Sequence, residues 1–201
     1  FNAPSLYQLY APTYGNKDLR PEKSRTYDYC MEVPFGKMII ASVRYFSART
    51  KDMINTDPTT YVYTNLSKTH SGGYQSLISA KPTESVSLSA QYTYTVAEDD
   101  TTHKQLIRQP KHSASAGITF EPVKKTILHL DGQYVSKKYD TFYDPSTWQA
   151  SRVTIRGYCL LNAYASTEIM DGFLTLYAKV NNITNTKYTM VYGYQSEGTT
   201  Y

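Results

Sequence analysis

The four histidines are the first candidates for chemistry in this sequence, because an imidazole can act as a base or bind a metal near neutral pH. They are scattered along the chain, as His70, His103, His112 and His129. No Ser stands in a Gly-x-Ser-x-Gly motif, and no His has the spacing to Cys or Asp that a metal site requires. P-loop and dinucleotide-binding motifs are absent as well. We therefore predict no catalytic site, no cofactor and no enzymatic activity.

Acidic residues in predicted loops are a second possibility, since carboxylate oxygens are the ligands that calcium prefers. Asp99 and Asp100 form one such pair, and Asp140 and Asp144 form another. Charged side chains in loops usually face water, however, and we favour that interpretation for both pairs. We therefore predict no metal site.

The elements that must position any functional side chain are β-strands, as the stretch Val86–Val96 illustrates. Its apolar residues occupy one parity, and its Ser, Gln and Thr residues occupy the other. Because successive side chains of a strand point to opposite faces, this stretch would form a ribbon with one apolar and one polar face. Its length of 11 residues is also what a tilted strand needs to cross a bilayer. On its own, the segment fits either a soluble sandwich or a membrane barrel.

The connections between the predicted strands favour the membrane barrel. Alternation recurs in segments that we place at about 25–33, 38–50, 61–81, 86–96, 112–120, 128–134, 152–165 and 174–180, with a ninth strand starting near Thr199. Short turns at 34–37, 82–85, 121–124 and 167–172 alternate strictly with long loops at 52–60, 98–110, 138–151 and 182–198. A meander with short turns at one end and long loops at the other is typical of an outer-membrane barrel, whereas a Greek-key sandwich would not sort its loops in this way.

Composition agrees with an all-β chain that forms a transmembrane antiparallel β-barrel. The 21 Tyr, against 6 Phe and 1 Trp, suit surfaces where an aromatic ring must also meet water. No apolar run approaches the length of about 18 residues that a transmembrane helix needs. The net charge of +4 is scattered, without the basic block that would predict a nucleic-acid partner. No targeting signal is recognisable, so either one was removed or the chain is an internal piece.

The ends of the chain predict a partial barrel. About nine strands that start and end in loops cannot close as a small barrel of even strand number. An open sheet in lipid would leave the backbone groups of its edges unpaired, at a cost of several kcal/mol each. We therefore expect either a fragment of a larger barrel or a chain that pairs with another chain to complete one.

Segments near both ends resemble a known family. Residues 1–10 (FNAPSLYQLY) and 15–24 (GNKDLRPEKS) resemble the F-x-A-P-x-L-x-x-L-Y and G-N-x-x-L-x-P-E-x-S signature of TonB-dependent outer-membrane receptors. Residues 180–188 (VNNITNTKY) resemble the N-L-x-[DN]-x-x-Y motif near the C-terminus of that family. Residues 191–195 (VYGYQ), followed by Gly198, are most similar to the vitamin B12 (cobalamin) receptors within it.

The resemblance implies a barrel of about 22 strands that is plugged by an N-terminal domain. Residues 1–201 would be the C-terminal part of that barrel, with about nine strands and without the plug. The implied function is uptake of a scarce, large nutrient through the outer membrane of a Gram-negative bacterium, with energy from the TonB complex. The implied partners are cobalamin or an iron chelate, outer-membrane lipid, and TonB and the plug through the missing N-terminal part. The apolar parity of Val86–Val96 would then face lipid, and its polar parity would face the plugged lumen.

Two ligand-binding residues follow from the resemblance. Arg108, in Leu106-Ile107-Arg108, stands where cobalamin receptors have a Leu-Leu-Arg segment whose arginine contacts the ligand. Tyr143 ends a Tyr-Asp-x-x-Tyr sequence at 139–143 that resembles a ligand-binding loop of those receptors. A guanidinium offers a planar fork to amide or phosphate oxygens, and a tyrosine offers a rigid face with one hydroxyl. Alternatively, Arg108 is a solvated charge at a strand end and Tyr143 an interfacial anchor. Gln109-Pro110 departs from the family pattern, so the resemblance does not define the local backbone after Arg108.

Other hypotheses remain open. A siderophore or haem receptor of the same family would share the fold and differ in the ligand. An outer-membrane barrel enzyme would need a Ser/His or acidic cluster outside this chain. An adhesin would use the long aromatic loops as its interface.

Overall fold

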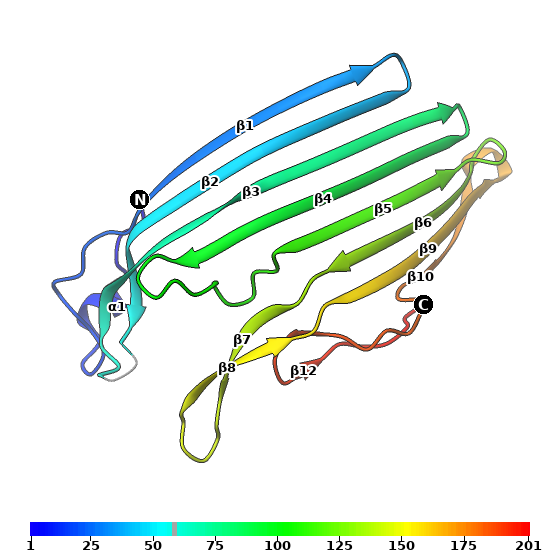
Figure 1. Ribbon diagram of the computed structural model, residues 1–201. Coiled ribbons are helices and arrows are strands. Elements are labelled where there is room, and N and C mark those ends of the chain that lie inside the picture. The colour runs from blue at the N-terminus through cyan, green and yellow to red at the C-terminus, as the bar shows by residue number, and fades with distance from the viewer. Residues whose placement is uncertain (58–59) are drawn as a thin grey trace. The chain divides into compact units, whose positions relative to one another are not determined.

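The computed structural model describes residues 1–57 and 60–201, and the chain is built almost entirely of β-strands (Figure 1). It consists of two compact units. The first unit contains residues 1–29, 45–73 and 96–106, and the second contains residues 30–44, 74–95 and 107–201. Part of the predicted loop 52–60, namely Pro58 and Thr59, lies outside the described residues.

Eight strands form the main sheet, in the order β1-β2-β3-β4-β5-β6-β9-β10. Neighbouring strands in the sheet are therefore successive along the chain, except where β7 and β8 intervene, as an up-and-down meander requires. The bounds are β1 (Lys23–Phe35), β2 (Ile39–Thr56), β3 (Tyr63–Thr83), β4 (Val86–Asp99), β5 (His112–Phe120), β6 (Thr126–Val135), β9 (Tyr158–Ile169) and β10 (Leu174–Val180). The predicted strands are confirmed in kind, although β2 extends further into the predicted loop 52–60.

Four predictions about the last third of the chain are wrong. The loop 138–151 is largely an antiparallel hairpin of β7 (Lys138–Tyr143) and β8 (Ala150–Ile155). The predicted strand 152–165 is interrupted at Arg156 and Gly157, between β8 and β9. The backbone at Gly157 lies so close to Val135 that a Cβ would be 2.7 Å from its carbonyl oxygen, so this position requires glycine. The ninth strand near Thr199 is only a bridge between Thr200 and Asn181, so the main sheet has eight strands. A second hairpin, β11 (Thr189–Val191) with β12 (Tyr194–Gln195), occupies the predicted loop 182–198.

In the second unit, the alternation of apolar and polar residues gives the sheet two chemically distinct faces. Leu88 lies opposite Ile118, and Ile118 lies opposite Leu130, so one face carries a continuous apolar row. Gln91 lies opposite Ser115 on the other face. The three apolar residues are 40%, 41% and 42% exposed, respectively. An exposed and continuous apolar face is what a strand needs in contact with lipid, and a soluble sheet would cover it.

The small number of buried apolar residues points the same way. Among the described residues, those with buried apolar side chains are Leu19, Ala97, Val135 and Ile155. A soluble chain of this length would bury a larger core to stabilise its fold. The helices of the described residues are short, and none has the length and apolar character needed to span a bilayer.

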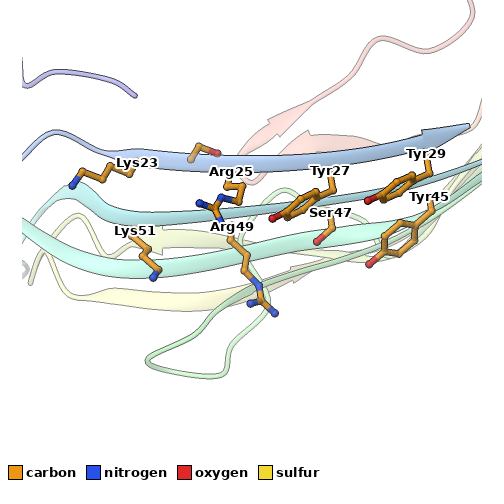
Figure 2. Close-up of a pocket in the computed structure, with 9 residues that line it drawn as sticks. Lys23, Arg25, Tyr27, Tyr29, Tyr45, Ser47, Arg49 and Lys51 are labelled. Atoms are coloured by element: carbon orange, nitrogen blue, oxygen red, sulfur yellow. The ribbon is translucent and has the colours of Figure 1, made fainter.

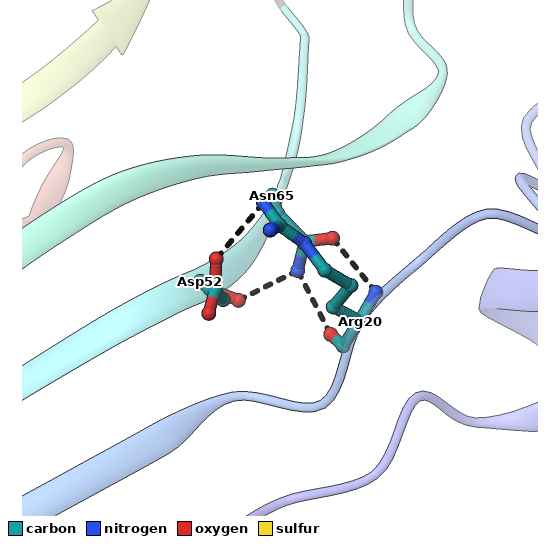
Figure 3. A network of polar contacts seen from close by, with 3 residues as sticks. All are labelled: Arg20, Asp52 and Asn65. Carbon is teal, nitrogen blue, oxygen red and sulfur yellow. Dashed lines mark hydrogen bonds and ion pairs between the residues drawn. The ribbon is translucent and has the colours of Figure 1, made fainter.

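In the first unit, Arg20 joins the N-terminal segment to β2 and β3 (Figure 3). Its guanidinium Nη2 lies 3.0 Å from Oδ1 of Asp52. The side-chain amide of Asn65 donates to the carbonyl oxygens of Arg20 and Asp52, at 2.9 and 2.6 Å, and its oxygen accepts the Arg20 N–H at 2.8 Å. The segment is thus held by both ends of one amide.

The N-terminal segment also contains α1 (Leu6–Tyr10), where we predicted only a loop. Ser5 and Gln8 form a capping box, in which each side chain accepts the backbone N–H of the other residue. Gly15 packs so closely on the end of this helix that a Cβ would lie 2.6 Å from the Ala11 nitrogen. The sequence signature at residues 1–24 therefore has a structural role.

Candidate functional site

Arg108 lies just before β5 and contacts the hairpin β7–β8 in the second unit. Its Nε donates to Oδ1 of Asp140 over 2.9 Å, and its backbone N–H donates to the Tyr139 carbonyl over 2.6 Å. Arg108 has a φ of 60°, in the left-handed region that non-glycine residues seldom adopt. Its side chain is 52% exposed. The hydrogen bond to Asp140 uses Nε, so it leaves the donor groups of the two terminal nitrogens for a ligand.

Asp140 is the centre of this arrangement, because its side chain is completely buried. Oδ1 also accepts the Thr141 N–H, and Oδ2 accepts the Tyr192 N–H, both at 2.9 Å. Burial alone would raise the pKa of Asp140. The hydrogen bonds from the backbone of Tyr192 and Thr141 and from Arg108 outweigh burial and lower the pKa below its ordinary value. Asp140 is therefore a carboxylate at neutral pH and fixes the orientation of Arg108.

Aromatic rings extend the surface around this carboxylate. The ring of Phe142 lies edge-on to that of Tyr192, with 5.4 Å between centroids. Tyr139 lies on the other face of the same hairpin, where the Arg152 guanidinium is 4.1 Å from the centroid of its ring, within the range of a cation–π contact. The two hairpins thus offer flat apolar faces and guanidinium groups, a combination suited to a large ligand with ring systems and amide or phosphate oxygens.

Tyr143 is at the end of β7 and is 59% exposed. It differs in parity from Asp140, so the two side chains leave opposite faces of the strand. The structure brings Arg108 together with Asp140, and through it with Tyr192. Tyr143 is on the same hairpin but on its other face. A ligand contact for Arg108 and Tyr143 remains a prediction.

A cavity of about 240 Å³ adjoins this cluster. Tyr192 contributes to its wall together with residues of the β8–β9 connection and of the segment before β11, including Arg156, Lys187 and Tyr188. Arg156 and Lys187 in the wall of this cavity are therefore two further cations near the Arg108–Asp140 pair.

Several other candidates from the sequence have partners within the protein. Asp99 and Asp144 each accept two backbone N–H groups that follow them in the chain, as turn residues do. Asp100 pairs with His70, and the Nδ1 of His129 lies 2.8 Å from the Thr119 hydroxyl. Within the described part of the chain, no three His, Cys, Asp or Glu side chains are grouped closely enough to hold a metal ion.

Asn182 explains why the C-terminal motif contains asparagine. It is 4% exposed, its amide donates to the Thr186 carbonyl at 3.0 Å, and its side-chain oxygen accepts the Thr186 N–H at 2.9 Å. Its backbone N–H donates to Asn162 of β9. This motif anchors the segment that leads to β11 and Tyr192.

A comparison with known protein families gives the same result as the strand order and the exposed apolar face. The β-barrel model of the TonB-dependent receptor-like family matches residues 1–183. The chain belongs to this family.

Within it, the chain is 26% identical to the vitamin B12 transporter BtuB of Vibrio cholerae strains, over 206 aligned positions. The alignment covers 96% of this chain and 31% of BtuB, so the chain spans about a third of the length of these curated relatives.

Solved structures share the fold. The copper transporter OprC aligns with a TM-score of 0.79 and 15% identity, over 98% of this chain and 33% of its own. The ferripyoverdine receptor of the Pseudomonas aeruginosa outer membrane aligns with a TM-score of 0.76 and 20% identity, over 92% and 27%. The ferric-catecholate import receptor Fiu of E. coli K12 aligns with a TM-score of 0.72 and 16% identity, over 99% and 29%. The main sheet is thus part of a transmembrane antiparallel β-barrel.

Sequence reasoning identified Arg108 as a candidate but missed the role of Asp140 and Tyr192. In the sequence, Asp140 was only a possible calcium ligand, and Tyr192 was only part of a segment that resembles the family. Tyr192 follows Asp140 by 52 positions, and only the tertiary structure shows that one holds the other.

Proposed function

We propose that this chain is the C-terminal part of the barrel of an outer-membrane active transporter, and that its ligand is cobalamin. The single observation that supports cobalamin as the ligand is the 26% identity to the vitamin B12 transporter BtuB over 96% of the chain. The rest of the protein supplies a plug domain and a segment that contacts TonB, and the protein lies in the outer membrane of a Gram-negative bacterium.

Arg108 and Tyr143 are the proposed ligand contacts. Arg108 is suited to this role because its side chain is half exposed while its Nε is fixed by a buried carboxylate. A fork that is already oriented loses less conformational freedom when it binds an amide or phosphate oxygen. Tyr143 adds an exposed ring and hydroxyl. Cobalamin, a large ring system with amide side chains and a phosphate, offers groups to both.

A siderophore or another iron chelate is the alternative ligand. The ferripyoverdine receptor and Fiu share the fold with this chain, but their identities of 20% and 16% speak for the fold alone. Arg108 would suit an anionic chelate for the same reason as a phosphate. Only a binding experiment separates the two ligands.

The test is cobalamin binding by the complete receptor that contains this chain, purified in detergent. We expect Arg108→Ala to weaken binding about 10-fold or more, as removal of a charge-assisted contact of roughly 1.5–3 kcal/mol would do. Lys124→Ala is the control, because Lys124 is an exposed cation in the turn between β5 and β6, at the opposite end of β5 from Arg108.

If Arg108→Ala binds cobalamin with unchanged affinity, Arg108 does not contact the ligand. If the complete receptor binds ferric siderophores and not cobalamin, the alternative ligand holds.

A further inference from the structure

Strands β1 and β2 show an ordered change of chemistry along one parity. Starting from the turn between them, β1 presents Val33 and Met31, then Tyr29 and Tyr27, and then Arg25 and Lys23. The same parity of β2 presents Ile39 and Val43, then Tyr45, and then Arg49 and Lys51. Both strands therefore pass from apolar residues to tyrosine and then to cations.

The tyrosines and cations lie together in the first unit, along a groove of about 740 Å³ (Figure 2). The rings of Tyr29 and Tyr45 stack at 6.4 Å between centroids, with 26° between their planes. Figure 2 shows these rings at one end of the groove and Lys23 and Lys51 at the other. Arg25 and Arg49 lie between them.

The four cations, Lys23, Arg25, Arg49 and Lys51, are all exposed. Within the described part of the chain, no carboxylate lies within ion-pair distance of any of them. The other parity of segments 23–29 and 45–51 contains no lysine or arginine. The charge is thus concentrated on one face and left without an anion.

A membrane has the same order of zones as this face. Its hydrocarbon accepts apolar side chains, tyrosines collect at the interface, and headgroup charges lie just beyond. Two residues of strand rise by about 6.6 Å, so Arg25 lies within headgroup distance of Tyr27. Tyr27 and Tyr29 are 48% and 65% exposed, as residues of an interfacial belt are.

We propose that these four cations form a binding site on the outer wall of the barrel for the phosphate groups of an outer-leaflet glycolipid. The inference rests on the proposed function, and it places the long loops outside the cell and the short turns in the periplasm, as in other outer-membrane barrels. Arg25 and Arg49 supply planar forks for phosphate oxygens, and Lys23 and Lys51 supply point charges. The tyrosines below them contact the upper part of the acyl chains and the sugar.

The experiment measures lipid retention by native mass spectrometry of the complete receptor in a non-ionic detergent, with diphosphorylated lipid A as the probe. We expect the wild-type receptor to retain this lipid. The variant with Lys23→Gln, Arg25→Gln, Arg49→Gln and Lys51→Gln should retain it at least about 10-fold more weakly, because four charge-assisted contacts are lost. Lys37→Gln with Lys124→Gln removes exposed charges near two short turns and should leave retention unchanged.

Equal retention by the four-fold variant, or equal retention of a dephosphorylated lipid A, would overturn the proposal. Displacement of the lipid by millimolar inorganic phosphate would also overturn it, in favour of a simple anion site. Heat-modifiable migration in electrophoresis shows that each variant is folded. Cobalamin binding is measured on the same samples to separate the two proposals. A wild-type receptor that retains the lipid but does not bind cobalamin would contradict cobalamin as the ligand and would support the lipid site.

Discussion

The Nε of Arg108 donates a hydrogen bond of 2.9 Å to Oδ1 of Asp140, a carboxylate with no exposed surface. The second oxygen of Asp140 accepts the N–H of Tyr192, which lies between β11 and β12. One buried carboxylate therefore holds the segment before β5, the hairpin β7–β8 and the hairpin β11–β12 in place. The orientation of Arg108 depends on a residue that need not touch the ligand.

Asp140→Asn should therefore weaken cobalamin binding by the complete receptor, although Arg108 is still present. An amide has one acceptor oxygen, and its NH₂ would face a donor N–H. We expect a loss of about 1–3 kcal/mol in the local stability of the hairpin, the usual cost of an unsatisfied buried group. Hydrogen exchange at the Tyr192 amide, together with a binding titration, measures both effects. Asp144→Asn is the control, since Asp144 is exposed and bonds only within its own turn.

The lowered pKa of Asp140 predicts a one-sided dependence on pH. Burial would raise the pKa, but the hydrogen bonds from Tyr192, Thr141 and Arg108 hold it below the ordinary value of 3.8. The stabilisation is complete above pH 3.8 and is lost as pH falls through the lower pKa of the folded state. Hydrogen exchange at the Tyr192 amide should be flat from neutral pH to about pH 4, after correction for the intrinsic rate, and should then accelerate. The same profile in Asp140→Asn would contradict this assignment.

Gly15→Ala should loosen the N-terminal segment. A Cβ at this position would lie 2.6 Å from the Ala11 nitrogen and 2.7 Å from its carbonyl oxygen, closer than real side chains approach backbone. We expect faster proteolysis within residues 1–22 of the folded receptor. Gly132→Ala is the matched control, because its nearest neighbour would be 3.8 Å away. Equal cleavage in the two variants would argue against the close packing.

The two faces of the main sheet should respond differently to charge. Leu130→Arg places a cation on the apolar face and should destabilise the receptor in lipid vesicles by about 2–4 kcal/mol if Leu130 lies near the bilayer midplane. Gln133→Arg, on the polar parity of the same strand β6, should have a much smaller effect. Urea unfolding in vesicles measures both values. Similar values for the two variants would contradict the assignment of the apolar face to lipid.

Much of the fold could be predicted, because alternating apolar and polar residues in the sequence show which side chains share a face of a strand. Val86–Val96 was placed within one strand with the correct parity, and β4 extends it only to Asp99. The hairpin β7–β8 was missed because its residues do not separate by polarity: Lys138 and Asp140 are both buried. Their burial results from contacts with other loops, which a local pattern does not record.

The candidate site was predictable only in part, for the same reason. Arg108 was found through a resemblance of three residues in the sequence. Its partner Asp140 comes 32 residues later, and Tyr192 another 52. Neither spacing has a period that a strand or turn would impose, so only the folded chain shows that the three belong together.

The most direct test of the whole account is uptake of radiolabelled cobalamin by cells that lack their own cobalamin receptor and express the complete protein. We predict accumulation in energised cells, a strong reduction when an uncoupler removes the energy supply, and a comparable reduction in Arg108→Ala. Absence of cobalamin uptake by energised cells with folded receptor in their outer membrane would contradict the proposed ligand, and uptake that an uncoupler does not reduce would contradict active transport.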